Sequence, residues 1–249
     1  MALLLPDPAA PTAPSVADGA VLVRGELVEA VGAFPELAAA HPTARVRDWG
    51  PAVLTPGLGN PWGRRLLERD YHPDPREEIG VEPVPDGLVG CDDESRYGAS
   101  ARRGLQRMLG FGVTAVAGPF ERAAVRTAVA RSGLVALMGV GPGGSGTGAG
   151  PGVGVGAGVG TGVGTGVGTG VGVGAGSGAG VGAGGLDPLV VLPLEQAVHG
   201  RVAVGGRADF AVFPVVPASA VLPRPGGAVP AAGGCLATVL GGRLVYRRR

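Results

Sequence analysis

"DGAVLVRGELVEAVG", residues Asp18–Gly32, alternates apolar and polar side chains on both sides of Arg24 and Gly25. This two-residue period is typical of half-buried β-strands. Gly25 can adopt the positive φ that a tight hairpin turn requires. The stretch therefore predicts a β-hairpin, and Pro35 indicates the first turn of a short helix over residues 35–41.

Further strands are predicted near both ends of the chain. On the N-terminal side they are "ARVRDW" (44–49) and "AVLTPG" (52–57). On the C-terminal side they are "DPLVVLPL" (187–194), "RADFAVFPV" (207–215) and "LATVLGGRLVYRRR" (236–249), the last with a hairpin turn at Gly241 and Gly242. Because an isolated hairpin is only marginally stable in water, we expect the two ends to share one sheet.

Between these ends, helices alternate with strands. Leu58–Tyr97 is rich in Pro, Asp, Glu and Arg and is predicted to be mostly loop, with a helical turn at Arg65–Arg69. Two helices, each followed by a strand, come next: a helix capped by Ser100 and ended by Gly110 or Gly112, "VTAVAG" (113–118), a helix over Glu121–Ser132 ended by Gly133, and "LVALMGV" (134–140). This alternation indicates parallel β/α units.

A glycine-rich repeat fills residues 139–185, where 47 residues hold 25 of the chain's 50 glycines. Glycine at every second position gives high backbone entropy and leaves almost no side chain to bury. We predict a disordered linker over 141–185, with stacked silk-like strands as the alternative. The G-x-G-x-x-G match at residues 139–144 lacks a following helix and a nearby acidic residue, so we interpret it as a by-product of the repeat.

Charge and cysteine content exclude several classes of function. The formal net charge is +1, so no global field attracts nucleic acid or an anionic membrane. Every basic side chain is arginine, which excludes Schiff-base lysines and carbamylated-lysine metal bridges. Two cysteines, Cys91 and Cys235, cannot build a disulfide framework, and Cys235 is expected in the core. Pro6 and Asp7 interrupt the apolar start of the chain, which predicts neither a signal peptide nor a membrane span, and we expect a cytoplasmic protein.

Five short motifs resemble the amidohydrolase superfamily, and within it imidazolonepropionase-like proteins. They are "DGAVLVRGELVEAVG", "RVRDW" (45–49), "VLTPGLGN" (53–60), "GRADFAVF" (206–213) and "ATVLGGRLVYRRR" (237–249). The resemblance covers roughly half of the non-repetitive chain. It implies a composite β-sandwich assembled from both chain ends beside a metal-binding (β/α)8 barrel, and a family activity of hydrolysing non-peptide carbon–nitrogen bonds.

Length indicates that the barrel itself is mostly absent, because a (β/α)8 barrel takes about 250 residues. Between Gly57 and Leu194 the chain has 138 residues, of which 91 lie outside the repeat, enough for two or three β/α units. The predicted fold class is α/β plus all-β. It combines a composite β-sandwich from residues 1–57 and 186–249, a truncated barrel-derived segment over 58–140 and the glycine-rich insert over 141–185.

The resemblance also implies the loss of a metal motif. In the family, P-G-L-x-N is followed by A-H-x-H, whose two histidines bind Zn or Fe. Here Asn60 is kept, but Trp62 and Arg64 stand at the two histidine positions. An indole offers no lone pair to a cation, and a guanidinium stays charged. We therefore expect no metal ligand at these positions and no metal cofactor.

Only "YHPDPREE" (71–78) combines a histidine with several carboxylates, namely His72, Asp74, Glu77 and Glu78. Such side chains can bind a hard metal ion or transfer protons. Their spacing matches no known ligand set, and a solvated surface loop is the alternative interpretation.

Three functions remain open on the sequence. The favoured hypothesis is a diverged, non-catalytic amidohydrolase relative, a pseudoenzyme. The second is an active hydrolase of a small cyclic C–N substrate with an unconventional site around His72. The third is a non-enzymatic scaffold or binding subunit, acting with a protein partner or as a homodimer.

Overall fold

A computed structural model of the chain describes residues 2–3, 16, 18–88, 90, 93–138, 185–214, 230 and 232–248. The glycine-rich repeat up to residue 184, the G-x-G-x-x-G match and Cys91 lie outside the described residues. The predictions made for those segments therefore stay predictions.

The predicted N-terminal hairpin is present. β2 (Gly19–Arg24) pairs with β3 (Leu27–Ala33) in antiparallel register, and Gly25 in the connecting turn has a φ of 61°. The helix α1 (Phe34–Ala40) follows directly, with Pro35 in its first turn. The alternation of side chains thus predicted both the strands and the turn correctly.

A five-stranded sheet joins the two ends of the chain. Its strands, in spatial order, are β1 (Ala2–Leu3), β4 (Ala52–Pro56), β8 (Phe210–Pro214), β9 (Ala237–Leu240) and β10 (Arg243–Arg247). β4 and β8 are far apart in sequence but pair antiparallel, with Leu54 opposite Val212. β9 and β10 form the predicted C-terminal hairpin around Gly241 and Gly242. The two ends thus share one sheet, as expected.

Both faces of this sheet are covered by other parts of the chain. Successive residues of a strand point to opposite sides, so neighbouring residues of β8 contact different apolar clusters. Phe210 and Val212 of β8 pack in one apolar cluster with Val28 of β3. Ala211 and Phe213, which alternate with them, belong to a second cluster formed mainly by the residues between β4 and β8. The five-stranded sheet is therefore a middle layer, with the hairpin β2–β3 on one face.

Backbone contacts also tie the hairpin to the C-terminal part of the chain. Val28 N donates to Gly206 O at 2.9 Å, and Gly205 N donates to Val28 O at 2.8 Å. The turn between β9 and β10 lies against the turn between β2 and β3, because a Cβ added at Gly242 would stand 2.0 Å from Gly25 O. The N-terminal hairpin therefore depends on residues from the other end of the chain.

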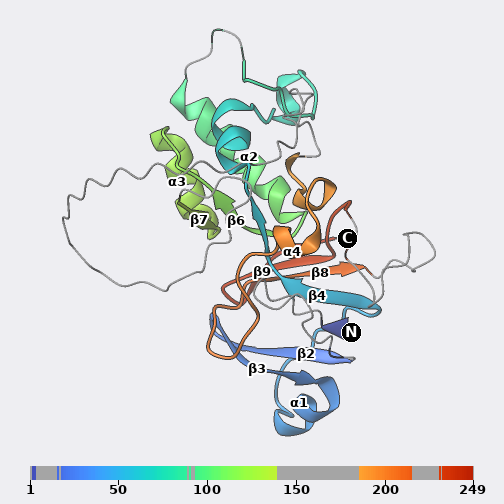
Figure 1. Ribbon diagram of the computed structural model, residues 1–249. Helices are drawn as coiled ribbons and strands as arrows, with labels where there is room; N and C mark the ends of the chain where they lie inside the picture. The colour runs from blue at the N-terminus through green and yellow to red at the C-terminus, as the bar shows by residue number, and fades with distance from the viewer. Residues whose placement is uncertain are drawn as a thin grey trace, which may run out of the picture.

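Three parallel strands lie on the other side of the middle layer. Their order is β5 (Leu58–Asn60), β6 (Val113–Ala117) and β7 (Val135–Leu137). The helices α2 (Glu94–Leu109) and α3 (Ala123–Ser132) precede β6 and β7, and Gly133 ends α3 with a φ of 80°. Figure 1 shows these helices at one end of the molecule, with α1 and the hairpin at the other. Two β/α crossovers thus lie within the described ranges, in agreement with the length of the segment.

Two strand predictions are wrong. Residues 44–49 form no strand: Val46 is 56% exposed, and Trp49 packs against the apolar cluster of the middle sheet from an irregular segment. Residues 187–194 form the 3-10 turn η4 (Pro188–Val190) and the start of α4 (Leu194–Ala197). Proline lacks the N–H that a strand ladder needs, and the Asp187 carboxylate instead caps η4 by accepting from Leu189 N at 3.0 Å.

The predicted start of the first long helix is also wrong. α2 begins at Glu94 rather than after Ser100, because the Asp93 carboxylate accepts from Ser95 N at 2.8 Å and caps the helix there. Gly98 weakens the helical pattern but permits close packing, since a Cβ on it would stand 3.0 Å from the Ala124 Cβ. The predicted turn at 65–69 is confirmed as the π-helical η1 (Arg65–Arg69), followed by the 3-10 turn η2 (Pro75–Glu77). None of the helices in the described ranges combines the length and apolarity needed to cross a membrane.

Candidate functional site

β5 ends at Asn60, whose buried side chain fixes the turn that follows. Its Oδ1 accepts from Trp62 N at 2.9 Å, and its Nδ2 donates to Gly185 O at 2.8 Å. The asparagine kept from the P-G-L-x-N pattern therefore connects the end of β5 to the start of the C-terminal segment. Its role in this structure is to satisfy backbone groups.

The residues after Asn60 lie directly against the end of β6. A Cβ on Gly63 would stand 2.8 Å from Ala117 O. Trp62 is partly buried and packs against the apolar cluster of the helical part. Arg64 forms ion pairs with Glu121 and, at 3.9 Å, with Glu68. A partly buried indole and a paired guanidinium thus follow β5.

Glu68 is a site residue that the sequence did not indicate. Its carboxylate is 9% exposed and accepts backbone N–H groups from Glu121 and, at 2.8 Å, from Arg122. Both donors immediately precede α3, where free N–H groups favour an anion. Glu68 therefore fastens η1 to the start of α3. Only its position in the folded chain reveals this role, since its partners lie more than fifty residues further on.

A pocket of about 670 Å³ opens beside these residues. Its lining consists of Pro61, Trp62, Arg64, Arg65, Glu68, Arg69, Glu121 and Arg122. The pocket lies next to the residues that follow β5, and open parallel sheets bind ligands outside the carboxyl ends of their strands. Chemically, such a lining offers guanidinium donors and an aromatic wall rather than imidazole ligands.

His72 lies in the core, with only 1% of its surface exposed. Its Nε2 is 2.8 Å from Leu66 O, and a Cβ added to Gly104 of α2 would stand 2.6 Å from that nitrogen. The backbone N of His72 donates to Ser100 Oγ at 2.8 Å. Burial lowers the pKa of His72 to about 4, so the ring is neutral at neutral pH. The ring therefore packs as a core side chain.

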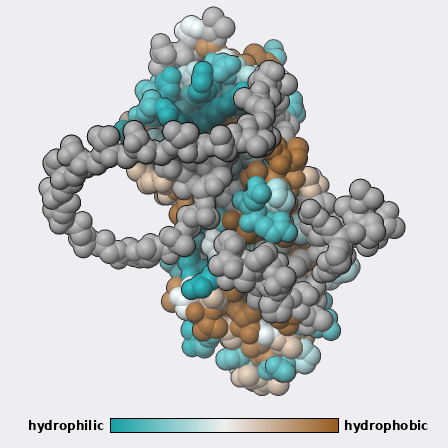
Figure 2. All heavy atoms as spheres, viewed as in Figure 1, coloured by the Kyte–Doolittle hydropathy of each residue, from teal (hydrophilic) through white to brown (hydrophobic). Residues whose placement is uncertain are grey.

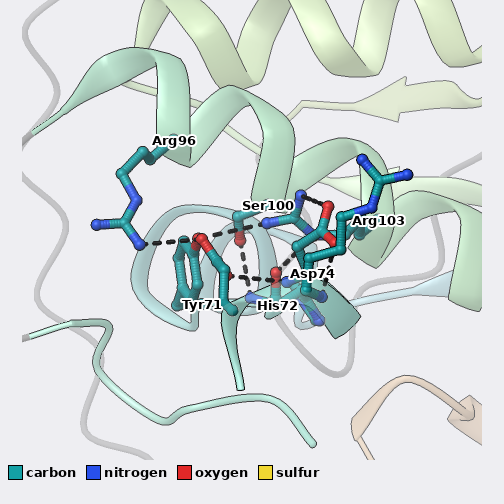
Figure 3. A network of polar contacts seen from close by, with 8 residues as sticks. Tyr71, His72, Asp74, Arg96, Ser100 and Arg103 are labelled. Atoms are coloured by element: carbon teal, nitrogen blue, oxygen red, sulfur yellow. Dashed lines mark hydrogen bonds and ion pairs between the residues drawn. The ribbon is translucent and has the colours of Figure 1, made fainter. Parts of the chain in front are cut away.

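The residues around His72 form a polar network that binds the loop to α2. Figure 3 shows Tyr71, Arg96 and Arg103 in this network. The Tyr71 hydroxyl donates to Glu77 at 2.7 Å, and Arg96 donates to the same carboxylate at 2.9 Å. With the Tyr71 hydrogen bond as the largest cause, these donors hold the pKa of Glu77 at about 2. Arg103 Nε donates to His72 O at 2.8 Å and so fastens the loop to the helix.

The four predicted candidates do not converge on one point. Asp74 and Glu77 form a capping box at η2, Glu78 is exposed with a φ of 58°, and His72 is turned toward Leu66. Within the described part of the chain, no group of three or more His, Cys, Asp or Glu side chains is placed to hold a metal ion. Figure 2 shows hydrophilic residues gathered at the end of the molecule where α2 lies, as a solvated face would be.

Two further carboxylates support turns at the C-terminal end. Asp209 Oδ1 accepts from Gly241 N at 2.7 Å, which fixes the turn between β9 and β10. Asp187 Oδ2 accepts from Gly233 N at 2.8 Å, and burial raises the pKa of this carboxyl. Cys235 is fully buried, as expected, and burial raises the pKa of its thiol to about 11. All three side chains therefore stabilise the fold.

Residues 19–44 match the family model of the imidazolonepropionase-like composite domain of bacteria. The matched segment contains β2, β3 and α1. The match confirms, over a short region, the resemblance to the amidohydrolase superfamily that the sequence motifs indicated. No curated protein matches the chain by sequence.

Several solved structures are partly similar to the chain. For the guanine deaminase from Bradyrhizobium japonicum, the TM-score is 0.34 with 18% identity, over 49% of this chain and 28% of that protein. For the A. niger ochratoxinase, the TM-score is 0.35 with 17% identity, over 55% of this chain and 29% of that protein. For an amidohydrolase from an environmental sample of the Sargasso sea, the TM-score is 0.35 with 20% identity, over 55% and 31%. The chain thus spans less than a third of each of these proteins.

The buried His72 predicts a loss of stability in mild acid. Its pKa is about 4 in the folded chain against 6.5 for an exposed histidine. Because the unfolded chain binds the proton more readily, the stability contributed by the neutral ring is present above pH 6.5 and is lost as the pH falls toward 4. Between about pH 7.5 and about pH 5 we expect a loss of about 2 kcal/mol in the free energy of unfolding.

Urea unfolding at a series of pH values measures this loss. His72→Gln should remove most of the pH dependence, leaving the smaller contribution of His199, whose pKa burial also lowers. His41→Gln, at the end of α1, is the matched control for replacing a histidine away from this core. A His72→Gln protein with the full pH dependence would show that other groups cause it.

Proposed function

We propose that the chain is a diverged, non-catalytic relative of the amidohydrolases. In this proposal, the two sheets packed through Phe210, Val212 and Val28 are the composite β-sandwich of that family. The strands β5–β7 with their helices are what remains of the barrel. The family match over residues 19–44 supports the first assignment, because it falls on the hairpin that packs against the middle sheet.

One observation carries the proposal: the end of β5 presents a packed indole and an ion-paired guanidinium. Trp62 is packed against the apolar cluster and Arg64 is paired with Glu121 and Glu68. Neither group can donate a lone pair to a cation. The residues at these positions therefore do not fit Zn or Fe, the metals that the family resemblance implies.

The nearby histidine does not supply a substitute. A metal ligand must present a free ring nitrogen at an accessible position, together with other ligands. His72 Nε2 contacts Leu66 O, and Nδ1, which has no hydrogen-bond partner among the described residues, is buried and so not accessible. Asp74 and Glu77 use their carboxylates in the capping box of η2. This arrangement favours a structural role for the loop over hydrolysis at a site of its own.

Elemental analysis of the chain purified without chelator tests the proposal. We expect Zn, Fe and Mn at far below one equivalent per chain, both as purified and after dialysis against each metal. A zinc enzyme taken through the same purification is the positive control. One tightly bound transition metal per chain would contradict the proposal, and its loss in His72→Gln would assign the site to the loop.

A further inference from the structure

The pocket beside β5 has a basic lining. Four arginines and two glutamates give its lining residues a formal charge of +2, in a chain whose net charge is only +1. One of those glutamates, Glu68, already uses its carboxylate in the fold, because it accepts two backbone N–H groups at the start of α3. The other, Glu121, is 70% exposed and pairs with Arg64. The lining therefore holds two more guanidinium groups than carboxylates, and Arg122 pairs with Glu94, outside the lining, at 3.1 Å.

Among the described residues, two of the arginines have their nearest carboxylates only at long distances. Arg65 Nε lies 3.9 Å from Asp70, and Arg69 Nη2 lies 3.5 Å from Asp86. Both distances exceed the length of a hydrogen bond between nitrogen and oxygen, roughly 3.2 Å at most. Each guanidinium carries five N–H donors in a planar fork that matches a carboxylate or a phosphate. Arg65 and Arg69 therefore have donors available on the wall of the same pocket.

The remaining lining supplies shape and an apolar surface. Trp62 is partly buried against the core, so its indole is held in place beside the arginines. The volume of about 670 Å³ lies within the range of small-molecule sites, roughly 300 to 1,000 Å³. The position next to the residues that follow β5 agrees with where parallel sheets bind ligands.

We propose that this pocket binds a small organic anion, a carboxylate or phosphate, whose charged group is held by Arg65 and Arg69 and whose body lies against Trp62. Bidentate guanidinium contacts to these groups are among the stronger hydrogen bonds in proteins. The inference goes beyond the proposed loss of catalysis and does not depend on it, because ligand binding and metal content are separate measurements.

Isothermal titration calorimetry of the full chain with phenyl phosphate and with benzoate tests the proposal, at constant ionic strength. Inorganic phosphate is the probe without an apolar body. We expect phenyl phosphate or benzoate to bind, and the one that binds identifies the charged group. Weaker binding of inorganic phosphate would support the part assigned to Trp62. Failure of all three anions at millimolar concentration would overturn the proposal.

The double variant Arg65→Gln/Arg69→Gln locates the site. Each lost charge-assisted contact should weaken binding about tenfold or more. The control Arg24→Gln/Arg243→Gln removes the same charge from exposed strand ends of the hairpins, at β2 and β10, and should bind like the unmodified chain. Equal weakening of anion binding in both variants would show that the effect comes from net charge alone, and this result would refute the proposed site. Arg69→Gln alone, at a 69% exposed side chain, repeats the test if the double variant does not fold.

Discussion

Removal of Cys235–Arg249 is expected to unfold the N-terminal hairpin together with the C-terminal strands. The deletion removes β9 and β10, which pair in order beyond β8 in the middle sheet. It exposes β8, whose other neighbour is β4. It also removes Gly242, whose N–H donates to Ala208 O and whose backbone lies against the turn at Gly25. The hairpin β2–β3 thereby loses the layer that supports it.

The energetic argument rests on burial. Ala237 is fully buried, and Val239 and Leu240 are 7% and 4% exposed. Burying a valine or leucine side chain stabilises a fold by roughly 1.5–3 kcal/mol, and whole domains are stable by only about 5–15 kcal/mol. An isolated two-stranded hairpin is only marginally stable in water. We therefore expect cooperative unfolding rather than a local loss.

Hydrogen exchange on the truncated chain measures the outcome at residues 21–31. We expect the amides that are protected in the full chain to exchange as fast as in an unfolded peptide. Val245→Thr, at a 40% exposed position of β10, is the control and should leave their protection intact. Full protection of the hairpin amides after truncation would mean that the N-terminal part folds on its own.

Local patterns predicted the elements whose signals lie within a few residues. The hairpin around Gly25, the turn at Gly241 and Gly242, and the end of α3 at Gly133 all require glycine at a positive φ. The continuous apolar run of β8 agrees with its position between two buried faces. In contrast, 187–194 was predicted as a strand from its apolar content, although its prolines and the Asp187 cap favour turns.

The candidate site depended on contacts that no local pattern contains. His72 is a core residue because α2 has a glycine at position 104 that lets the ring approach. Glu68 is held by N–H groups that precede α3, and Asn60 by the carbonyl of Gly185. The sequence therefore indicated which side chains have useful chemistry. It could not indicate which of them the fold uses for its own stability.

Gly57→Ala is expected to cost about 3 kcal/mol of stability, because the site has no space for a methyl group. Gly57 joins β4 to β5, and so connects the middle sheet to the parallel strands. A Cβ there would stand 2.0 Å from Oγ1 and 2.2 Å from Cγ2 of Thr114, a fully buried residue of β6. The Gly57 backbone is also fixed, since its carbonyl accepts from His199 N at 2.8 Å. Neither side can move without breaking buried contacts.

Thermal and urea unfolding of matched variants measure this cost. Gly59→Ala, two residues further along, is the control, because a Cβ there would meet its nearest atom at 3.4 Å, an ordinary contact. It should change the free energy of unfolding by less than about 1 kcal/mol. Thr114→Gly removes all three atoms that clash with the new methyl group, so Gly57→Ala should cost far less in a Thr114→Gly background. If Gly57→Ala were no more harmful than Gly59→Ala, the close packing of the β4–β5 junction against β6 would be wrong.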